Sequence, residues 1–334
     1  MSAELSIGVA IVGCGLIGNK RAGALGPARL IACVDVELDR ALELARARGV
    51  EGHSDWRQLL DEEEVDIVIV ATTNDSLAEI TRACVEAGKH VLVEKPAGRS
   101  VREVKSVIEA AQQSNGLVRV GFNHRHHRAV RKARALIEGG ALGELMYVRG
   151  RYGHGGRPGY EREWRADPAL AGGGELLDQG VHLIDLARWF LGDFSEVMGF
   201  AHTYFWQMPV EDNGFMLLKT AAEKVAFLHV SWTEWKNLFS LEIYGRDGKL
   251  QIDGLGGSYG VEQLVHYKML PQMGPPESTI WQYPTEDDSW EFEFAEFLKD
   301  IRMGRKPSPS LEDAQAALEV VERIYAESAH DHSP

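Results

Sequence analysis

The sequence predicts an α/β protein with two domains: a doubly wound parallel sheet over residues 1–122, then an α+β domain with an open, mostly antiparallel sheet over residues 123–334. Three observations support this prediction. The chain has 334 residues, which is long for one hydrophobic core. In the first part, apolar runs alternate with helix-like stretches, as in repeated βαβ units. In the second part, short strand-like runs follow one another, separated by turn residues, which is typical of antiparallel sheets.

The first domain is predicted to contain five strands joined by helices. Apolar runs such as IGVAIV and DIVIVAT place the strands at 7–12, 30–36, 66–72, 90–95 and 117–122. Helices are expected between them, near 17–25, 37–48, 76–87 and 100–114. This strict alternation favours parallel strands with helical crossovers.

The second domain begins with a predicted helix near 125–138 and a strand at 145–152. A loop rich in Gly and Arg, 153–173, leads into an apolar helix over 172–190. Alternating strand candidates follow at 215–220, 225–232, 239–245 and 249–253. The Pro-rich loop LPQMGPP precedes two closing helices near 289–303 and 311–328.

Composition excludes several classes of protein. Asp and Glu number 50 against 36 Lys and Arg, and the net charge of -14 argues against a nucleic-acid or anionic-membrane surface. Cys14, Cys33 and Cys84 are odd in number and lie in the first third of the chain, unlike a disulfide framework. The first apolar stretch is too short for a membrane span or a signal core. We therefore expect a cytoplasmic protein.

Glycines after the first predicted strand indicate a phosphate site. Gly13, Gly15 and Gly18 have the spacing G-x-G-x-x-G at the start of a predicted helix. Glycines allow a tight turn and close approach of a pyrophosphate, which then lies at the positive helix N-terminus. Alone, this motif is weak evidence, but its position between strand and helix predicts a dinucleotide site. Further residues expected to line it are Leu16, Ile17, Thr72, Asn74 and Glu94.

Asp35 indicates which dinucleotide binds. It ends the second predicted strand, about 20 residues after the glycines, where a carboxylate can hold the adenosine ribose hydroxyls. No Arg is adjacent to receive a 2′-phosphate, although Arg40 lies nearby. We predict NAD in preference to NADP. The alternative is that Asp35 caps the next helix.

Lys95 follows the fourth predicted strand, in the sequence Glu94-Lys95-Pro96. Ligands of open α/β sheets bind beyond the carboxyl ends of the strands, so Lys95 is expected to point toward the nicotinamide. The alternative is a surface lysine held by Glu94, an arrangement that contributes little.

The apolar helix over 172–190 carries three polar residues: Asp178, His182 and Asp185. At about 100° per residue, positions i, i+4 and i+7 share one stripe of a helix. Such a stripe is costly to bury unless its groups bond to each other or face a cavity. The residues alone leave both possibilities open, a hydrogen-bonded structural cluster or a site.

Four segments together resemble the Gfo/Idh/MocA oxidoreductases. They are the G-x-G-x-x-G, AGKHVLVEKP at 87–96, GFNHRHH at 121–127 and GGGELLDQGVHLIDLARW at 172–189, and the resemblance continues to GRKPSPSLEDAQAALEV at 304–320. It implies a Rossmann domain followed by an open-faced sheet that often forms the oligomer interface, here of a homodimer or homotetramer. It also implies that Lys95, Asp178 and His182 are catalytic.

The resemblance implies hydride transfer between a nicotinamide and a secondary alcohol or ketone of a sugar. His182 is expected to exchange the hydroxyl proton, because a group that titrates near neutrality does so well. Lys95 would hydrogen-bond the same oxygen and stabilise alkoxide character. Asp178 would orient the imidazole or bind a neighbouring hydroxyl, whereas Asp185 is expected to be structural.

Two departures from the family pattern concern the substrate side. Leu77 stands where many members have His, and His126-His127 replace an aromatic residue after Arg125. The histidines His124, His126 and His127 suggest a metal, but no spaced Cys or acidic cluster completes a site, so none is predicted. Trp206, Trp232, Trp235 and Phe239 are expected to pack the second sheet or an interface.

The substrate prediction rests on residues 151–167. This loop carries Arg151, His154, Arg157, Arg162 and Arg165 in an otherwise acidic chain, and Arg suits phosphate or carboxylate. We therefore predict an anionic, nucleotide-linked sugar, bound by residues of this loop and of the family motifs: Lys95, Asn123, Arg125, Arg157, Tyr160, Trp164, Arg165, Asp178 and His182.

Other interpretations remain open. The arginines can instead pair with Glu161, Glu163 and Asp167, or brace a subunit contact. The enzyme would then be an inositol or free-sugar dehydrogenase. A third possibility is a non-catalytic NAD-binding sensor or corepressor, against which the joint presence of Lys95, Asp178 and His182 argues.

Overall fold

The computed structural model describes residues 7–330, which divide into two compact units. Within these residues, the first unit comprises the chain up to Phe122 together with Trp290–Gln315. The second comprises Asn123–Ser289 and the chain from Ala316 onward. The break after Phe122 coincides with the division made from the sequence. Trp290–Gln315, which that division assigned to the second domain, is instead part of the first unit.

The first unit contains a six-stranded sheet in the order β3-β2-β1-β4-β5-β6, all parallel. Its strands are β1 (Gly8–Val12), β2 (Arg29–Val34), β3 (Glu51–His53), β4 (Ile67–Val70), β5 (His90–Glu94) and β6 (Val118–Gly121). This is the Rossmann order, so the predicted fold class of this unit is confirmed. β3 was not predicted because EGH is short and not apolar. From β1 the strands are added outward to β2 and β3 on one side and to β4, β5 and β6 on the other, so the strand order reverses between β1 and β4. Ligands of open α/β sheets bind at such a switch point.

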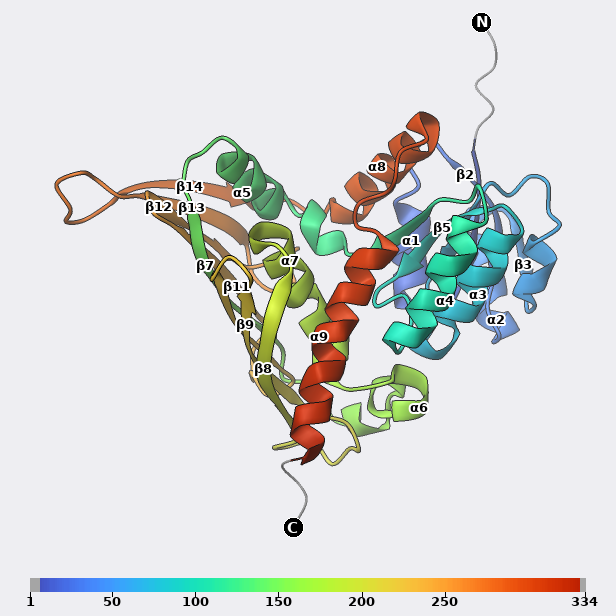
Figure 1. The fold of residues 1–334 in the computed structure, drawn as a ribbon. Helices are drawn as coiled ribbons and strands as arrows, with labels where there is room; N and C mark the ends of the chain where they lie inside the picture. Colours follow the sequence, from blue (N-terminus) through green and yellow to red (C-terminus); the bar gives the residue numbers. More distant parts are fainter. Residues whose placement is uncertain (1–6, 331–334) are drawn as a thin grey trace, which may run out of the picture. The chain divides into compact units, whose positions relative to one another are not determined.

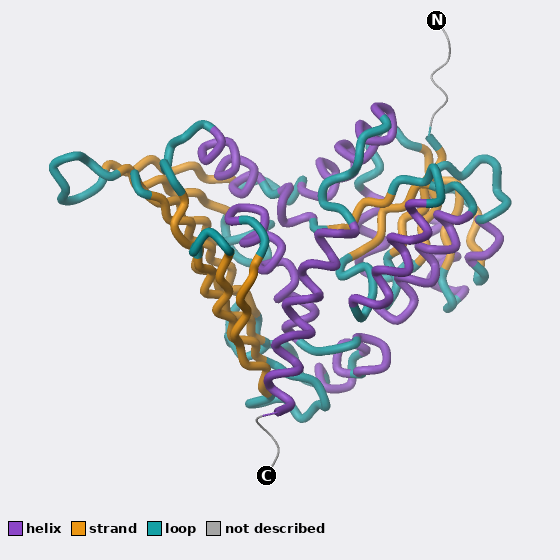
Figure 2. Tube along the Cα trace, viewed as in Figure 1, coloured by secondary structure: helices purple, strands orange, loops and turns teal. Residues whose placement is uncertain are grey.

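Helices cover both faces of this sheet (Figure 1, Figure 2). They are α1 (Leu16–Gly23), α2 (Leu38–Arg48), α3 (Asn74–Glu86), α4 (Val101–Gln112) and α8 (Ser289–Met303), with a short 3-10 helix at Trp56–Leu59. One core cluster joins α1, α2 and α8 to the sheet, and α3 packs beside α4. Phe294 and Phe297 of α8 lie in that cluster, and buried Arg119 of β6 pairs with Asp300 at 2.5 Å. These contacts explain why α8 belongs to the first unit.

The second unit contains an eight-stranded sheet in the order β14-β13-β12-β11-β7-β10-β9-β8. Its strands are β7 (Leu145–Gly153), β8 (Phe194–His202), β9 (Asn213–Thr220), β10 (Val225–Ser231), β11 (Leu238–Gly245), β12 (Gly248–Asp253), β13 (Glu262–Lys268) and β14 (Glu277–Tyr283). β7 and β10 pair in parallel and the other neighbours pair antiparallel. The predicted mostly antiparallel sheet is therefore confirmed.

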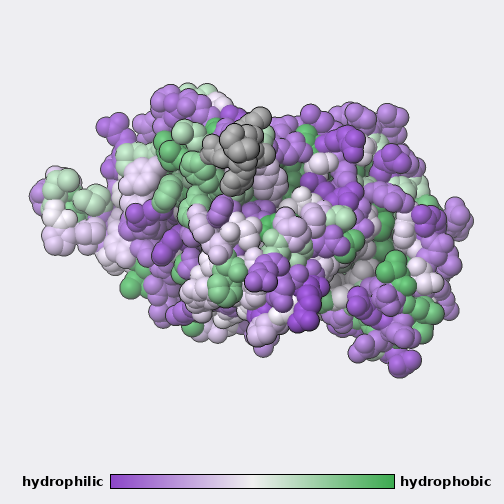
Figure 3. Space-filling view, turned by 90° about the horizontal axis from the view of Figure 1, so that it is seen from below, coloured by the Kyte–Doolittle hydropathy of each residue, from purple (hydrophilic) through white to green (hydrophobic). Residues whose placement is uncertain are grey.

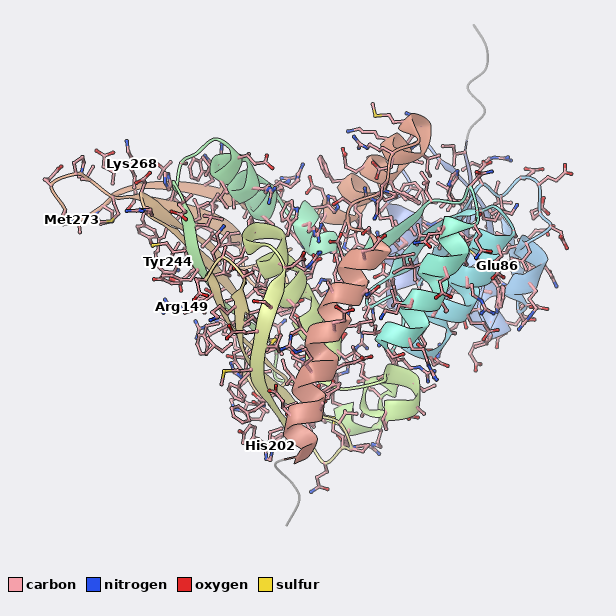
Figure 4. All side chains as sticks on the ribbon, viewed as in Figure 1. Glu86, Arg149, His202, Tyr244, Lys268 and Met273 are labelled. Atoms are coloured by element: carbon pink, nitrogen blue, oxygen red, sulfur yellow. The ribbon has the colours of Figure 1, made fainter. Side chains whose placement is uncertain are left out.

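Helices lie on one face of this sheet, and the described residues place none on the other (Figure 1). They are α5 (Arg128–Glu138), α7 (Val181–Leu191) and α9 (Leu311–His330) from Ala316 onward; shorter turns occur at Asn123–His126, Tyr160–Arg162, Trp164–Ala166, α6 (Pro168–Ala171) and Leu176–Gly180. The strands alternate accordingly: Leu228 of β10 is buried, whereas its neighbour Phe227 is 52% exposed. Arg149 and Tyr244 lie on the side away from α7 (Figure 4).

The aromatic residues expected to pack the second sheet divide into two groups. Trp232 and Phe239 are fully buried, whereas Trp206 is half-buried and Trp235 is exposed.

On the face in Figure 3, hydrophilic and hydrophobic residues are interspersed. Among the helices of residues 7–330, none is both long and apolar enough to cross a bilayer.

Candidate active site

The loop between β1 and α1 has the backbone of a phosphate cradle. Gly13 has a φ of +94°, and a Cβ there would collide with the Ala71 carbonyl. A Cβ at Gly18 would collide with the Gly13 carbonyl, whereas one at Gly15 would meet no atom within 4 Å. Gly15 caps α1 without a side-chain acceptor, and the first turn carries no acidic residue. The positive helix end therefore fits an anionic ligand.

Asp35 follows β2 and lies beside this loop. Its carboxylate accepts hydrogen bonds from the backbone N–H of Cys14, at 2.7 Å, and of Glu37, at 2.9 Å. The first hydrogen bond fixes the aspartate against the glycine loop. The second, from the residue that precedes α2, is consistent with the alternative that Asp35 helps to cap this helix. Two apolar side chains at this end of the sheet are exposed, Val36 by 86% and Leu16 by 74%. Exposed apolar groups beside this carboxylate offer a surface suited to the flat face of an aromatic base.

The N-terminal turn of α3 follows β4 at the same edge. Thr72 accepts a hydrogen bond from Ser76 Oγ at 2.9 Å, and Asn74 is buried in the first turn. Leu77, the departure from the family pattern, is fully buried on this helix. Because it packs in the core, it is not available as a substrate contact.

Glu94 and Lys95 have different environments. The Glu94 carboxylate is buried and lies 2.5 Å from the guanidinium of Arg21, which also contacts Glu293 at 2.6 Å. The ring of Trp290 covers Arg21 at 4.4 Å. Glu94 was predicted to bind the cofactor, but its side chain is committed to this core network. Lys95 is half-buried and directly follows β5. Because the preceding residue, Glu94, is anchored by Arg21, the backbone that carries Lys95 is held in place.

The helix bearing Asp178 and His182 starts with a π-helical turn. This turn spans Leu176–Gly180 and continues directly into α7. Its entry is held by Glu211, whose carboxylate accepts hydrogen bonds from the N–H groups of Gly174 and Leu176, both at 3.0 Å. π-turns widen the helix and occur often at functional sites. The ideal spacing expected for the polar stripe is therefore altered at Asp178.

Each polar residue of the stripe contacts a group from another segment of this unit. Arg165 donates through Nε to Asp178 Oδ2 at 3.0 Å. His182 is 5% exposed, and its ring stacks on that of His124 with centroids 3.7 Å apart. Asp185 is 1% exposed and accepts two hydrogen bonds from Arg125, at 2.8 and 2.5 Å. This bidentate pair supports the structural role predicted for Asp185, and it commits Arg125, predicted to bind substrate, to the same role.

The segment after β6 is buried and is bonded to other parts of the second unit. Asn123 Nδ2 donates to Ser289 Oγ at 3.1 Å. His127 Nδ1 lies 3.0 Å from the Glu262 carboxylate. Burial by itself raises the pKa of Glu262, but the hydrogen bond and charge of His127, with two backbone N–H groups, outweigh burial, so the pKa is lowered overall. Within residues 7–330, no group of three or more His, Cys, Asp or Glu side chains is placed to hold a metal ion. His124 of this segment stacks on His182, and His127 pairs with Glu262.

Two arginines of the segment 151–167 form ion pairs with acids of the same segment. Arg157 pairs with Glu163 at 2.7 Å and Arg162 with Glu161 at 3.7 Å. The alternative of local ion pairs is therefore seen for both arginines. Tyr160, predicted to bind substrate, is 4% exposed in a core cluster with Val210 and Trp232. Trp164 is half-buried, and its ring lies 4.6 Å from the guanidinium of Arg165.

Three residues beside His182 were not predicted. The ring of Tyr152, on β7, lies 6.4 Å from that of His182. Tyr259 accepts a hydrogen bond from Gln179 at 2.9 Å, and burial raises the pKa of Tyr259 to about 12. Strand alternation could have indicated that Tyr152 faces inward, but Tyr259 lies in a glycine-rich loop without periodicity. The imidazole of His182 therefore lies beside the rings of His124 and Tyr152, and Tyr152 in turn packs against Tyr259.

Two named dehydrogenases are similar to this chain in sequence. The levoglucosan dehydrogenase of Pseudarthrobacter phenanthrenivorans is 38% identical over 202 residues, 60% of this chain and 51% of that protein. The chain thus matches about half the length of this relative. The myo-inositol 2-dehydrogenase of Thermotoga maritima is 25% identical over 330 residues, 93% of this chain and 92% of the relative.

Solved structures resemble the whole chain. A levoglucosan dehydrogenase in complex with NADH and levoglucosan has a TM-score of 0.87 and 26% identity, covering 98% of each chain. GenD2 from gentamicin A biosynthesis, in complex with NAD, has a TM-score of 0.82 and 25% identity, covering 98% of this chain and 95% of the other.

Two family models match successive parts of the sequence. Residues 7–122 match an oxidoreductase family with an NAD-binding Rossmann fold. Residues 130–251 match the GFO/IDH/MocA C-terminal domain. Together with the glycine loop and the helix bearing Asp178 and His182, these matches identify the chain as a member of the Gfo/Idh/MocA oxidoreductase family.

Proposed function

We propose that this protein is an NAD-dependent dehydrogenase of a small sugar or cyclitol, interconverting a secondary alcohol and its ketone. The observation that carries the proposal is that one chain combines a built dinucleotide cradle with Lys95, Asp178 and His182, the three residues that the resemblance to the family implies are catalytic. Named relatives include levoglucosan and inositol dehydrogenases. A non-catalytic sensor would not need all three reactive side chains.

The residues of the first unit fit NAD. Gly15 leaves open space before the uncapped N-terminus of α1, which suits a pyrophosphate. Asp35 suits a ribose diol and would repel a 2′-phosphate, and Val36 and Leu16 offer apolar cover for an adenine. When bound, the nicotinamide accepts or returns the hydride. The protein must therefore supply the proton transfer and the polar contacts to the substrate oxygen.

His182 is proposed to take the hydroxyl proton during oxidation and to return it during reduction. An imidazole titrates near neutrality, which suits both directions. Its ring plane is held by the stack on His124. Lys95 would donate a hydrogen bond to the same oxygen and favour alkoxide character. Asp178, held by Arg165, would bind a neighbouring hydroxyl or orient the imidazole.

A neutral polyol is the better-supported substrate class. The prediction of an anionic, nucleotide-linked sugar rested on the loop arginines, and Arg157, Arg162 and Arg165 each lie within 4 Å of a carboxylate. Charges that are already paired add less attraction for an anion. The names of the relatives also favour unphosphorylated sugars and cyclitols. The anionic sugar stays a prediction for the assay to test.

A homo-oligomer formed through the open face of the second sheet is also proposed. This face has no covering helix within the described residues and exposes large apolar side chains, among them Met198, Phe200, Leu217 and Phe227. A contiguous exposed apolar area commonly marks an interface.

A substrate panel tests the proposed function. Purified protein is supplied with NAD and, separately, with levoglucosan, inositols, free hexoses, sugar phosphates, and UDP- and dTDP-sugars, and NADH formation is followed. We expect turnover with a neutral polyol, abolished in a Lys95→Met variant that still binds NADH. Turnover of nucleotide sugars far above that of neutral polyols would restore the anionic-sugar prediction. NAD binding without turnover of any candidate would favour the sensor.

A further inference from the structure

The segment between β7 and α6 carries three arginines with different partners. Arg157 and Arg162 pair with Glu163 and Glu161, acids of the same segment. Arg165 instead reaches the helix of the candidate site and pairs with Asp178. Of these three arginines, Arg165 contacts a proposed reactive group directly, whereas Arg157 and Arg162 contact acids of their own segment.

The geometry of Arg165 restrains its guanidinium on two sides. Its Nε lies 3.0 Å from Asp178 Oδ2, and the ring of Trp164 lies 4.6 Å from its guanidinium. The side chains of Arg165 and Asp178 are 30% and 17% exposed, so water screens their attraction only in part. The negative charge of Asp178 raises the pKa of Arg165 above its usual range, although burial opposes this.

The backbone beneath Asp178 is held from a different direction. Glu211 binds the N–H groups of Gly174 and Leu176, and it accepts a hydrogen bond from Tyr325 of α9 at 2.7 Å. These contacts fix the entry of the helix but do not orient the Asp178 side chain. Its rotamer depends on what its carboxylate touches. Arg165 provides such a contact from outside the helix.

We propose that Arg165 is a positioning residue for Asp178, and that this ion pair fastens the segment 153–167 to the helix that carries Asp178 and His182. This inference rests on the proposed function and assigns the loop a role in preparing the site in place of binding an anion. A carboxylate held in one rotamer presents its hydrogen-bonding oxygens in a fixed direction to a substrate hydroxyl. Small misplacements of such groups can cost about 10²-fold in rate.

Arg165→Gln and Arg165→Lys test the inference, with Arg246→Gln, at an exposed arginine of the same unit that pairs with Glu144 at 3.8 Å, as the matched control. We expect Arg165→Gln to lower kcat on the polyol about 10- to 100-fold, with the Kd of NADH unchanged. Arg165→Lys keeps the charge and should recover part of the loss, whereas Arg246→Gln should retain wild-type kcat. In an Asp178→Asn background, Arg165→Gln should add little, because the partner is already gone.

Trypsin cleavage after Arg162 provides a readout independent of turnover. The fastened segment should be cut several-fold faster in both Arg165→Gln and Asp178→Asn than in wild type or Arg246→Gln. If no polyol is turned over but cleavage accelerates in this pattern, the proposed function fails and the fastening stands. Equal cleavage in all variants, or Arg165→Gln kinetics equal to those of Arg246→Gln, would overturn the inference. Matching circular dichroism spectra show that the variants are folded.

Discussion

The imidazole rings of His124 and His182 stack with centroids 3.7 Å apart and an angle of 16° between their planes. His124 is itself held: its Nδ1 lies 3.1 Å from Asn123 Oδ1, and Asn123 donates to Ser289. The second unit thus fixes the plane of His182 with its own residues. A preset imidazole can exchange a proton without first reorienting, which is what a general acid/base requires.

Replacing His182 with Ala is expected to lower turnover on the order of 10²-fold or more, with NADH binding nearly intact. The reason is that the proposed base lies on the second unit, whereas the dinucleotide cradle belongs to the first. Turnover and NADH fluorescence titration measure the two effects. His202→Ala, at an exposed histidine of the same unit, is the control. Wild-type turnover in the His182 variant would show that the base assignment is wrong.

Asp35 predicts the choice of dinucleotide. NAD(H) should bind at least tenfold more tightly than NADP(H), a difference of about 1.4 kcal/mol, because the carboxylate repels a 2′-phosphate. Asp35→Asn removes the charge but retains an oxygen that can accept the hydrogen bond of Cys14 N–H. It should therefore narrow the ratio of the two Kd values without unfolding the glycine loop. Equal affinities in wild-type protein would contradict this prediction.

The ion pair between Arg125 and Asp185 is predicted to be structural. Both side chains are almost fully buried, and removing one partner leaves the other charge uncompensated. Arg125→Met should lower the free energy of unfolding by about 3–5 kcal/mol. Adding Asp185→Leu should restore much of the loss, because no buried charge then remains. Urea denaturation of the single and double variants checks both statements, and an unchanged midpoint for Arg125→Met would refute the first.

Some of the site could be predicted from sequence because local motifs determine it. The spacing of the glycines predicts the loop after β1, and hydrophobic periodicity predicts the apolar helix that carries His182. The partners of Arg125 and Arg165 could not be predicted, because ion pairs across 60 and 13 residues depend on how segments pack. The burial of Tyr160 could not be predicted for the same reason. An aromatic residue in a loop is expected to be exposed, and its packing against Trp232 depends on the tertiary structure. The π-turn at Asp178 has no signal in hydrophobic periodicity.

Glu262 predicts a loss of stability in acid. Its folded-state pKa is lowered, since its hydrogen bonds and the charge of His127 outweigh the effect of burial. As the pH falls, the unfolded chain takes up this proton before the folded protein does. The contribution is therefore fully present above the ordinary Glu pKa of about 4.3 and is lost as the pH falls through the lower folded value. Glu262→Gln should flatten the dependence of the unfolding midpoint on pH in this range. A variant with the wild-type slope would show that other carboxylates dominate.

The open sheet face is expected to carry the subunit contact. Across three neighbouring strands, Met198, Leu217 and Phe227 stand opposite one another in register and are 63%, 46% and 52% exposed. The row continues to Arg149, which pairs with Glu242 at 2.5 Å, so the apolar row is bordered by an ion pair. Phe227→Asp would place an unpaired charge in the centre of a buried interface, which costs far more there than on a free surface. We expect this variant to sediment as a smaller species than the wild type. Glu86→Gln, a change on the first unit, is the control and should sediment as the wild type does. A wild-type protein that is monomeric, or a Phe227 variant of unchanged mass, would show that this face is not the interface.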